Sequence, residues 1–169
     1  MGAGAGGIAI TPDGKTAYVI SSLGVTPINT ATNNPGKLIK IPGGDIAITP
    51  DGKTAYVAAG SGTVTPVRIA TNRVLKPIHV GTNASHIAIT PDGKTAYVTS
   101  NLGVTPINTA TNKPGTLIKI PGGDIAITPN GKTAYVTSSL GVTPINIATN
   151  KPGKLIKVAG GAGLIVITP

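Results

Sequence analysis

The chain has 169 residues, and it contains no Cys, Phe, Trp or Glu. The missing Cys excludes disulfides, thiolate metal sites and cysteine nucleophiles, and the predominance of Ile, Val, Thr, Gly and Pro favours strands and turns over helices. Fourteen Lys and Arg stand against five Asp, and the net charge of +9 favours attraction to nucleic acid, anionic lipid or acidic polymers. We expect no membrane-spanning segment, and residues 1–7 have neither the basic region nor the apolar run of a signal peptide.

A ten-residue motif dominates the chain and occurs four times. It reads Ile-Thr-Pro-Asp-Gly-Lys-Thr-Ala-Tyr-Val from Ile10 and returns from Ile48, Ile89 and Ile127, with Asn130 replacing Asp in the last copy. Each copy is followed by Val-Thr-Pro and then by Ala-Thr-Asn. An internal repeat of about 40 residues is typical of architectures in which one supersecondary unit has been copied.

The first unit is predicted to contain four short antiparallel strands, over residues 8–11, 16–19, 25–29 and 37–41. The connection through residues 12–15 has the chemistry of a hairpin turn, because Pro fixes φ, Asp caps the turn and Gly adopts the left-handed conformation. Pro27 cannot donate a hydrogen bond to a ladder, so we expect a bulge or a locally broken ladder around it.

Four short strands per unit predict an all-β fold, a β-propeller built from four-stranded antiparallel blades, with four blades per chain. We expect one propeller or half-propeller domain over residues 1–169. In the first strands a large Ile alternates with a small residue, usually Ala, which lets neighbouring sheets pack on both faces. A sandwich or a β-solenoid is the open alternative. The units and one extra copy of the first strand cover approximately residues 8–45, 46–86, 87–124, 125–164 and 164–168.

Residues 97–100 and 135–138 read Tyr-Val-Thr-Ser, and each follows Thr-Pro-Asp/Asn-Gly-Lys-Thr-Ala. With Val-Thr-Pro-Ile-Asn-Thr-Ala-Thr-Asn over residues 104–112, they make the chain resemble the YVTN-family β-propeller repeat over essentially its whole length. The likeness departs from the family pattern in the final Ser and in the copies at 18–21 and 56–59. It implies a bacterial or archaeal protein of the surface-layer type, exported or on the cell surface, with a ring that is usually seven-bladed. A fold shared this widely does not choose an activity.

Four units are fewer than the usual ring requires, and residues 8–11 and 164–168 are two copies of the same strand. A single four-bladed ring has no place for both copies. We therefore expect a homodimer with eight blades that forms through these terminal strands, one chain's terminal strand completing a blade of the other. A closed four-bladed monomer is the alternative. The near-identity of the units also fits a truncated, recently amplified or engineered propeller.

The residue just before each first strand is expected near the mouth of the central channel. Asp45, His86 and Asp124 occupy such positions, and together they could hold a divalent cation or a polar ligand. A metal-dependent propeller hydrolase would use the same three residues. The alternative is that they are solvated turn residues. No other cofactor is indicated.

No catalytic residues are predicted, because the chain lacks Glu and most of its Asp belong to the repeated turns. We expect a non-enzymatic structural or interaction scaffold that associates with itself. The alternative function is nucleic-acid or polyanion binding through lysines of the fourth strands. These lysines are Lys37, Lys40, Lys76, Lys119, Lys154 and Lys157.

Overall fold

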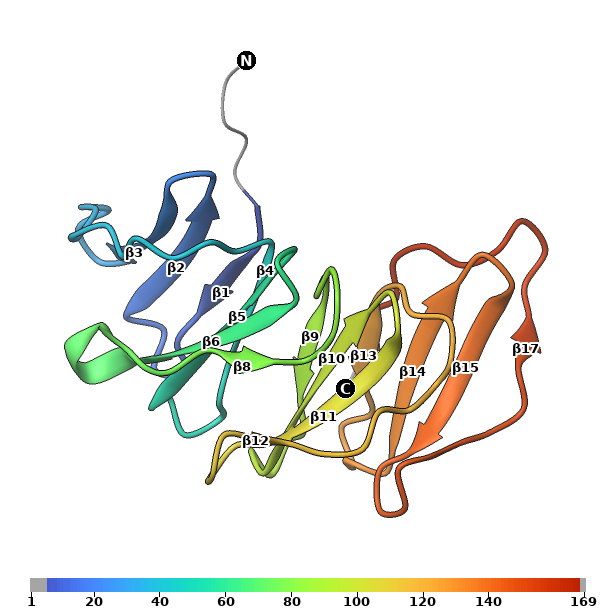
Figure 1. Cartoon of the computed structure of the whole chain (residues 1–169). Helices are drawn as coiled ribbons and strands as arrows, with labels where there is room; N and C mark the ends of the chain where they lie inside the picture. Colours follow the sequence, from blue (N-terminus) through green and yellow to red (C-terminus); the bar gives the residue numbers. More distant parts are fainter. Residues whose placement is uncertain (1–5, 168–169) are drawn as a thin grey trace.

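Four antiparallel sheets follow one another along the chain in the computed structural model, which describes residues 6–167 (Figure 1). The first sheet contains β1 (Ile8–Ile10), β2 (Thr16–Ser21) and β3 (Gly24–Asn29). The second contains β4 (Asp45–Ile48), β5 (Thr54–Ala59), β6 (Thr63–Arg68), β7 (Arg73–Val74) and β8 (Ile78–His79), with a short 3-10 helix at Ile69–Thr71. The third contains β9 (Ile87–Ile89), β10 (Thr95–Ser100), β11 (Gly103–Asn108) and β12 (Lys113–Pro114). The fourth contains β13 (Ile125–Ile127), β14 (Thr133–Ser138), β15 (Gly141–Asn146), β16 (Lys151–Pro152) and β17 (Ile156–Lys157).

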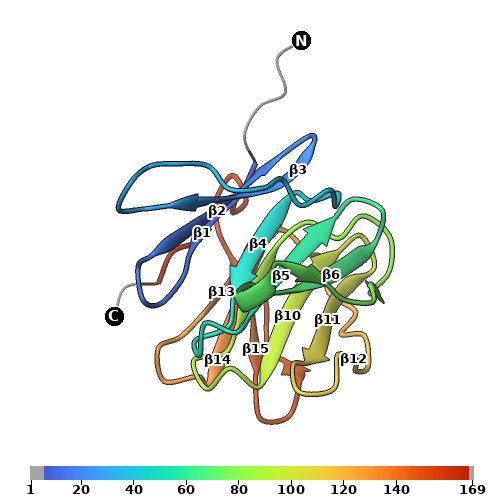
Figure 2. The same cartoon turned by 90° about the vertical axis from the view of Figure 1, so that its left-hand side faces the viewer.

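The four sheets are the blades of an open arc. The inner strands β1, β4, β9 and β13 lie beside one another in chain order, and the first and fourth blades stand at opposite ends (Figure 1). Figure 2 views the same arc from the side of the first blade. The all-β, four-bladed fold predicted from the repeats is confirmed, whereas the alternative of a closed four-bladed ring differs from the arrangement seen here.

The extra copy of the inner strand, predicted at 164–168, forms no strand within the described residues. Residues 164–167 are extended chain without a ladder partner, and Thr168 lies outside the described residues. A strand needs a neighbour to satisfy its backbone groups. The second strand of the fourth blade, β14, cannot serve, because it is already paired with β13 on one edge and with β15 on the other.

The hydrophobic core lies between successive blades, not within any one of them. One apolar cluster joins the first and second blades, another the second and third, and a third the third and fourth. Tyr56, from the second strand of its blade, is fully buried against Ile107 and Ala96 of the next blade. Because the second and third sheets are covered on both faces and the first and fourth on one, each blade depends on its neighbours for stability.

The proline in each third strand breaks the outer ladder and leaves the inner one intact. Pro27 pairs with Tyr18 in an uninterrupted register between β2 and β3. Its carbonyl accepts the Gly36 N–H at 2.7 Å, on the outer side, where its own N–H is missing. The fourth strand is therefore reduced to short pieces, which in the first blade are isolated bridges from Ile39 and Pro35. The locally broken ladder is confirmed, without a bulge.

The hairpin turn between the first two strands of each blade is held by side chains. In the third blade, Thr90 Oγ1 donates to Asp92 Oδ1 at 2.7 Å, and the same carboxylate accepts the Lys94 N–H at 3.1 Å. Gly93 has a φ of +72°, the left-handed conformation expected from the sequence. The fourth blade makes the same two bonds with the neutral amide of Asn130. The turn therefore needs the oxygen at this position and not its charge.

We expect the triple variant Asp13→Asn, Asp51→Asn and Asp92→Asn to fold at neutral pH with stability close to that of the parent chain. The Thr hydroxyl that bonds each carboxylate, aided by the Lys N–H, lowers its pKa below the ordinary value of 3.8. Because the folded pKa is depressed, these carboxylates stabilise the fold above the unfolded pKa, and this contribution is lost as pH falls through the folded pKa. The parent should therefore lose more stability than the variant between pH 5 and about 2. Urea unfolding followed by circular dichroism measures this, and parallel pH curves would contradict it.

Candidate functional site

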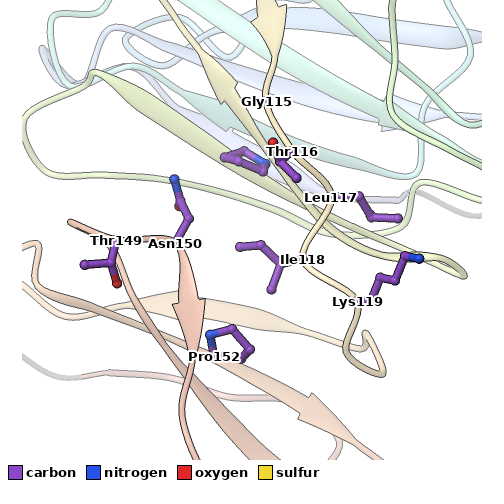
Figure 3. Close-up of a pocket in the computed structure, with 9 residues that line it drawn as sticks. Gly115, Thr116, Leu117, Ile118, Lys119, Thr149, Asn150 and Pro152 are labelled. Carbon is purple, nitrogen blue, oxygen red and sulfur yellow. The ribbon is translucent and has the colours of Figure 1, made fainter.

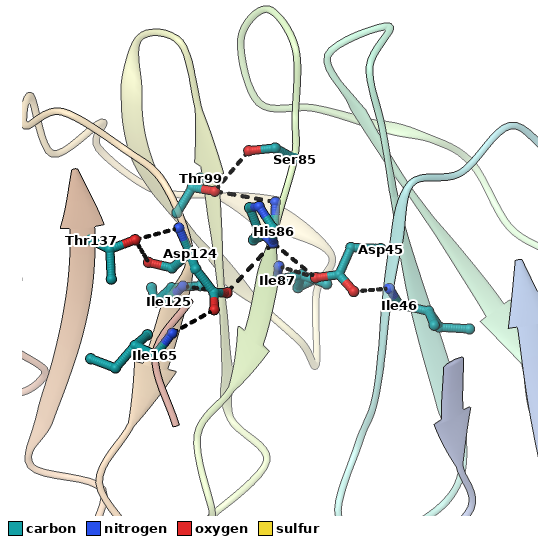
Figure 4. Close-up of polar contacts among 10 residues, drawn as sticks. All are labelled: Asp45, Ile46, Ser85, His86, Ile87, Thr99, Asp124, Ile125, Thr137 and Ile165. Carbon is teal, nitrogen blue, oxygen red and sulfur yellow. Dashed lines mark hydrogen bonds and ion pairs between the residues drawn. The ribbon is translucent and has the colours of Figure 1, made fainter. Parts of the chain in front are cut away.

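Three polar side chains converge where the inner strands of the second, third and fourth blades begin (Figure 4). Asp45 is the first residue of β4, and His86 and Asp124 directly precede β9 and β13. His86 Nδ1 lies 3.9 Å from Asp45 Oδ2 and 3.5 Å from Asp124 Oδ1, and all three side chains are partly exposed. The structure thus brings together the three residues that the sequence suggested as a set.

Both carboxylates hold backbone N–H groups of inner strands. Asp45 Oδ1 accepts the N–H of Ile46 in its own blade at 2.8 Å, and Oδ2 accepts the N–H of Ile87 in the next blade at 2.9 Å. Asp124 repeats the pattern with Ile125 at 2.8 Å and with Ile165 at 3.0 Å. Hydrogen bonds to a charged acceptor are stronger than neutral ones. Asp45 therefore fastens β4 to β9, and Asp124 fastens β13 to the segment around Ile165.

Hydroxyl groups on the second strands hold the backbone of this cluster. The N–H of His86 donates to Thr99 Oγ1 at 3.2 Å, and the N–H of Thr99 donates to the His86 carbonyl at 2.9 Å. The N–H of Asp124 donates to Thr137 Oγ1 at 2.8 Å. The side chains of the cluster are therefore presented from a fixed backbone.

These bonds decide what the cluster can do chemically. Each oxygen of Asp45 and Asp124 already accepts an N–H, so a cation would have to share those oxygens. Among residues 6–167, no group of three His, Cys, Asp or Glu side chains has an arrangement that could hold a metal ion. Metal binding by Asp45, His86 and Asp124 stays a prediction, while the geometry gives Asp45 a role in joining two blades and Asp124 a role in holding the segment around Ile165.

A second series of bonds, between Tyr and Asn, crosses each blade interface. In each of the first three blades, the Tyr of the second strand donates its hydroxyl to the Asn of the Ala-Thr-Asn motif in the following blade, where that Asn has a left-handed φ. The three pairs are Tyr18 with Asn72 at 2.9 Å, Tyr56 with Asn112 at 2.7 Å and Tyr97 with Asn150 at 2.6 Å.

These phenols are protonated and able to donate at neutral pH, and burial extends this state to higher pH by raising their pKa values. Burial raises the pKa of Tyr56 to about 12, and the charge of Asp51 adds to the effect. The pKa values of Tyr18 and Tyr97 are also raised, mainly by burial. Each interface is thus an apolar cluster with a hydrogen bond on the wider side, and the interface between the second and third blades also has the Asp45 bond beside the channel.

The series ends with one unmatched group on each end face of the arc. Asn33 of the first blade has the same left-handed conformation, with a φ of 57°, and Tyr135 of the fourth blade occupies the position of the donating Tyr. Within residues 6–167, no hydrogen bond joins either side chain to another blade. The arc therefore presents an acceptor at one end and a donor at the other.

The same end faces expose apolar side chains. Ile8 of β1 is 61% exposed, whereas its counterpart Ile87 in β9 is 7% exposed. At the other end, Leu164 and Val166 are each 87% exposed. Exposed apolar surface that continues a buried pattern marks an interaction surface.

The six lysines predicted as a polyanion site do not converge. All six are exposed, and they lie on the fourth-strand segments at the outer edges of four different blades. Further basic residues, Arg73, Lys113 and Lys151, lie on the same segments, and all five Asp lie elsewhere. The outer rim therefore carries positive charge only.

The rim contains an open groove of about 500 Å³ between the third and fourth blades (Figure 3). It is lined by the segment from Gly115 to Lys119 on one side and by Thr149, Asn150 and Pro152 on the other. Asn150 is also the acceptor for Tyr97. The groove exists because the broken fourth strand leaves the blade edge uneven.

The sequence reading missed the Tyr–Asn pairs. The signal was present, because Tyr and the Ala-Thr-Asn motif recur once in every unit. What the repeat could not show is that the partner of each Tyr comes from the next unit and not from its own.

Neither a family model nor a curated protein matches the sequence. Solved structures match it well. Hydrazine synthase from Kuenenia stuttgartiensis is 28% identical with a TM-score of 0.80, and the match covers 89% of this chain and 49% of that one. A functionally unknown protein from Desulfotomaculum acetoxidans DSM 771 is 22% identical with a TM-score of 0.80, over 99% of this chain and 59% of that one.

The RRP9 WD40 repeats are 14% identical with a TM-score of 0.83, and the match covers 96% of this chain and 54% of that one. The chain thus spans about half the length of the structures it matches. These matches show the propeller-like fold. Within the described residues, no helix is long and apolar enough to cross a membrane.

We expect Asp45→Asn to destabilise the fold by about 1–3 kcal/mol, because one of two buried N–H groups loses its acceptor. The matched control is Asp124→Asn. Its amide can still accept from Ile125, and the bond it loses holds only the segment around Ile165. The control should therefore cost clearly less. Urea unfolding of both variants measures the difference, and equal losses would contradict the role of Asp45 in joining blades.

Proposed function

We propose that this chain is a non-enzymatic scaffold that associates with a second copy of itself into an eight-bladed ring. The observation that carries the proposal is the match between its two end faces. The fourth blade offers the hydroxyl of Tyr135, and the first blade offers Asn33 in the conformation that receives a Tyr at every interior interface. In a ring of two copies, both junctions would repeat the interior contact.

The apolar surfaces favour the same assembly. An exposed strand edge and exposed Ile side chains tend to recruit another chain, and Ile8 and Ile10 are exposed on the end face of the first blade. A head-to-tail contact closes into a ring when the rotation between copies fits. Matched structures about twice as long support a half-ring for this chain.

The absence of activity is part of the proposal. The titratable cluster nearest the channel has both carboxylates engaged with backbone N–H groups, which supports a structural role for them. We also place the chain with the YVTN-type propellers, on the Tyr-Val-Thr-Ser segments of β10 and β14. An exported or surface location would follow from that placement.

The charge distribution favours polyanion binding as a second candidate function. Positive charge alone occupies the outer rim, while the carboxylates lie in the turns, paired with Lys, or beside the channel. A flexible acidic polymer could follow the rim across several blades without meeting a carboxylate. The buried tyrosines offer no stacking surface, so attraction to the polymer backbone would dominate.

We expect light scattering after size exclusion to give twice the chain mass at high concentration, and Tyr135→Phe to weaken this dimer about five- to tenfold, since a ring of two copies loses two hydrogen bonds. Asn33→Ala should have a similar effect, and combining the two should add little. Tyr56→Phe is the control. It removes the same hydroxyl from an interior interface, so it should lower the stability of the monomer by about 1 kcal/mol and leave the strength of the dimer unchanged. A chain that stays monomeric at all concentrations would disprove the ring.

We expect the triple variant Lys40→Gln, Lys119→Gln and Lys157→Gln to elute from heparin at clearly lower salt than the parent chain, because counterion release depends on the number of contacts. The matched control removes the same charge from the turns, by Lys15→Gln, Lys53→Gln and Lys94→Gln. Those lysines pair with Asp13, Asp51 and Asp92. Equal shifts for both variants would indicate attraction by net charge and exclude a rim site.

A further inference from the structure

The segment Leu164–Ile167 occupies a place that belongs to an inner strand. The N–H of Ile165 donates to Asp124 Oδ2 at 3.0 Å, as the N–H of Ile87 donates to Asp45 Oδ2 at 2.9 Å. Just before it, the N–H of Ala162 donates to the carbonyl of Ser138 at 2.9 Å. Towards the fourth blade, the segment thus imitates the inner strand of a following blade.

A second copy that docks on the fourth blade brings its own inner strand to the same place. That strand is β1, whose Ile8 corresponds to Ile87 and to Ile165 in the repeat. The inner edge of β2 can pair with one strand only, because β3 covers its other edge. Two segments therefore compete for one position at each junction.

The packing favours β1 over the terminal segment. Ala9 contacts the apolar cluster between the first and second blades, and Ala47 and Ala88 occupy the same position at the next two interfaces. The terminal segment has Val166 there, and two additional methyl groups in a packed interface are destabilising.

Backbone bonds hold β1 to its own blade and to the second blade. The N–H of Ile20 donates to the Gly7 carbonyl at 2.9 Å, and the N–H of Gly7 donates to the Gly44 carbonyl at 3.2 Å. Displacing β1 would break these bonds as well as its ladder with β2. The terminal segment has no ladder to lose, and Leu164 and Val166 are almost fully exposed.

We propose that the face of the fourth blade is the docking surface for the first blade of a second copy, and that residues 164–167 cover it as a built-in competitor. The inference rests on the proposed dimer and adds its regulation. On docking, β1 of the second copy takes the position, its Ile8 N–H replaces that of Ile165 at Asp124, and the terminal segment is released. The reverse arrangement, in which the terminal segment stays and completes the blade of the second copy, is the competing outcome.

Two proline variants of the full chain distinguish these arrangements. Ile165→Pro removes the N–H that binds Asp124, so it should release the competitor and tighten the dimer about tenfold. Val166→Pro is the matched control, because the Val166 N–H makes no hydrogen bond within the described residues, and the dimer should keep its strength. If the terminal segment completed the second copy, Val166 would take the ladder position of Ala9 opposite Tyr18, and Val166→Pro would abolish the dimer.

Hydrogen exchange of the parent chain at low and high concentration gives a second readout. Peptides containing residues 160–167 should lose protection on dimer formation, while peptides containing β1 gain it. If residues 160–167 gained protection and β1 lost it, the inference would be wrong but the proposed dimer would still hold. The same conclusion would follow if Ile165→Pro left the strength of the dimer unchanged. A chain that is monomeric in both the parent and Ile165→Pro forms would overturn the inference together with the dimer.

Discussion

Burial between blades is the constraint on which the rest of this structure depends. Every sheet is apolar on both faces, and each apolar cluster takes its members from two successive blades. Hydrophobic burial scales with the apolar area removed from water, so a blade with one neighbour lacks about half of its stabilisation. Both end faces of the arc therefore expose apolar surface, and whether the chain associates depends on what covers these faces.

Hydrogen bonds fix the relative placement of neighbouring blades, which burial alone does not. The apolar clusters alone would tolerate small shifts between blades, because hydrophobic contact is non-directional. The Tyr–Asn bond fixes the wider side of each interface, and Asp45 fixes the inner strands of the second and third blades beside the channel. An interface of this kind accepts one relative placement of two blades. Since the units are nearly identical, the last blade is shaped for the first one.

The repeat made the fold predictable, because its strands, turn residues and period all indicate the same unit. The convergence of Asp45, His86 and Asp124 also followed from topology, since inner strands of successive blades start together at one channel end. The Tyr97–Asn150 pairing did not follow, because a repeat shows recurrence and hides which copy supplies the partner. That the strand predicted at 164–168 does not form over residues 164–167 was equally unpredictable. The sequence repeats a strand there, but strand formation needs a neighbour that the described chain does not supply.

Near-identical interfaces allow a chain to associate with further copies without limit, and the proposed role of the terminal segment bears on this. A head-to-tail contact between equal faces can close into a ring or grow into an open filament, depending on the rotation between copies. A weakly held cover on one face leaves this balance unchanged. It adds the same cost to every junction, in a ring as in an open chain, and so raises the concentration at which a first contact forms. In the proposed ring, the second junction would form within one particle and be insensitive to dilution, which would favour the ring over a filament at low concentration with or without the Ile165–Asp124 bond.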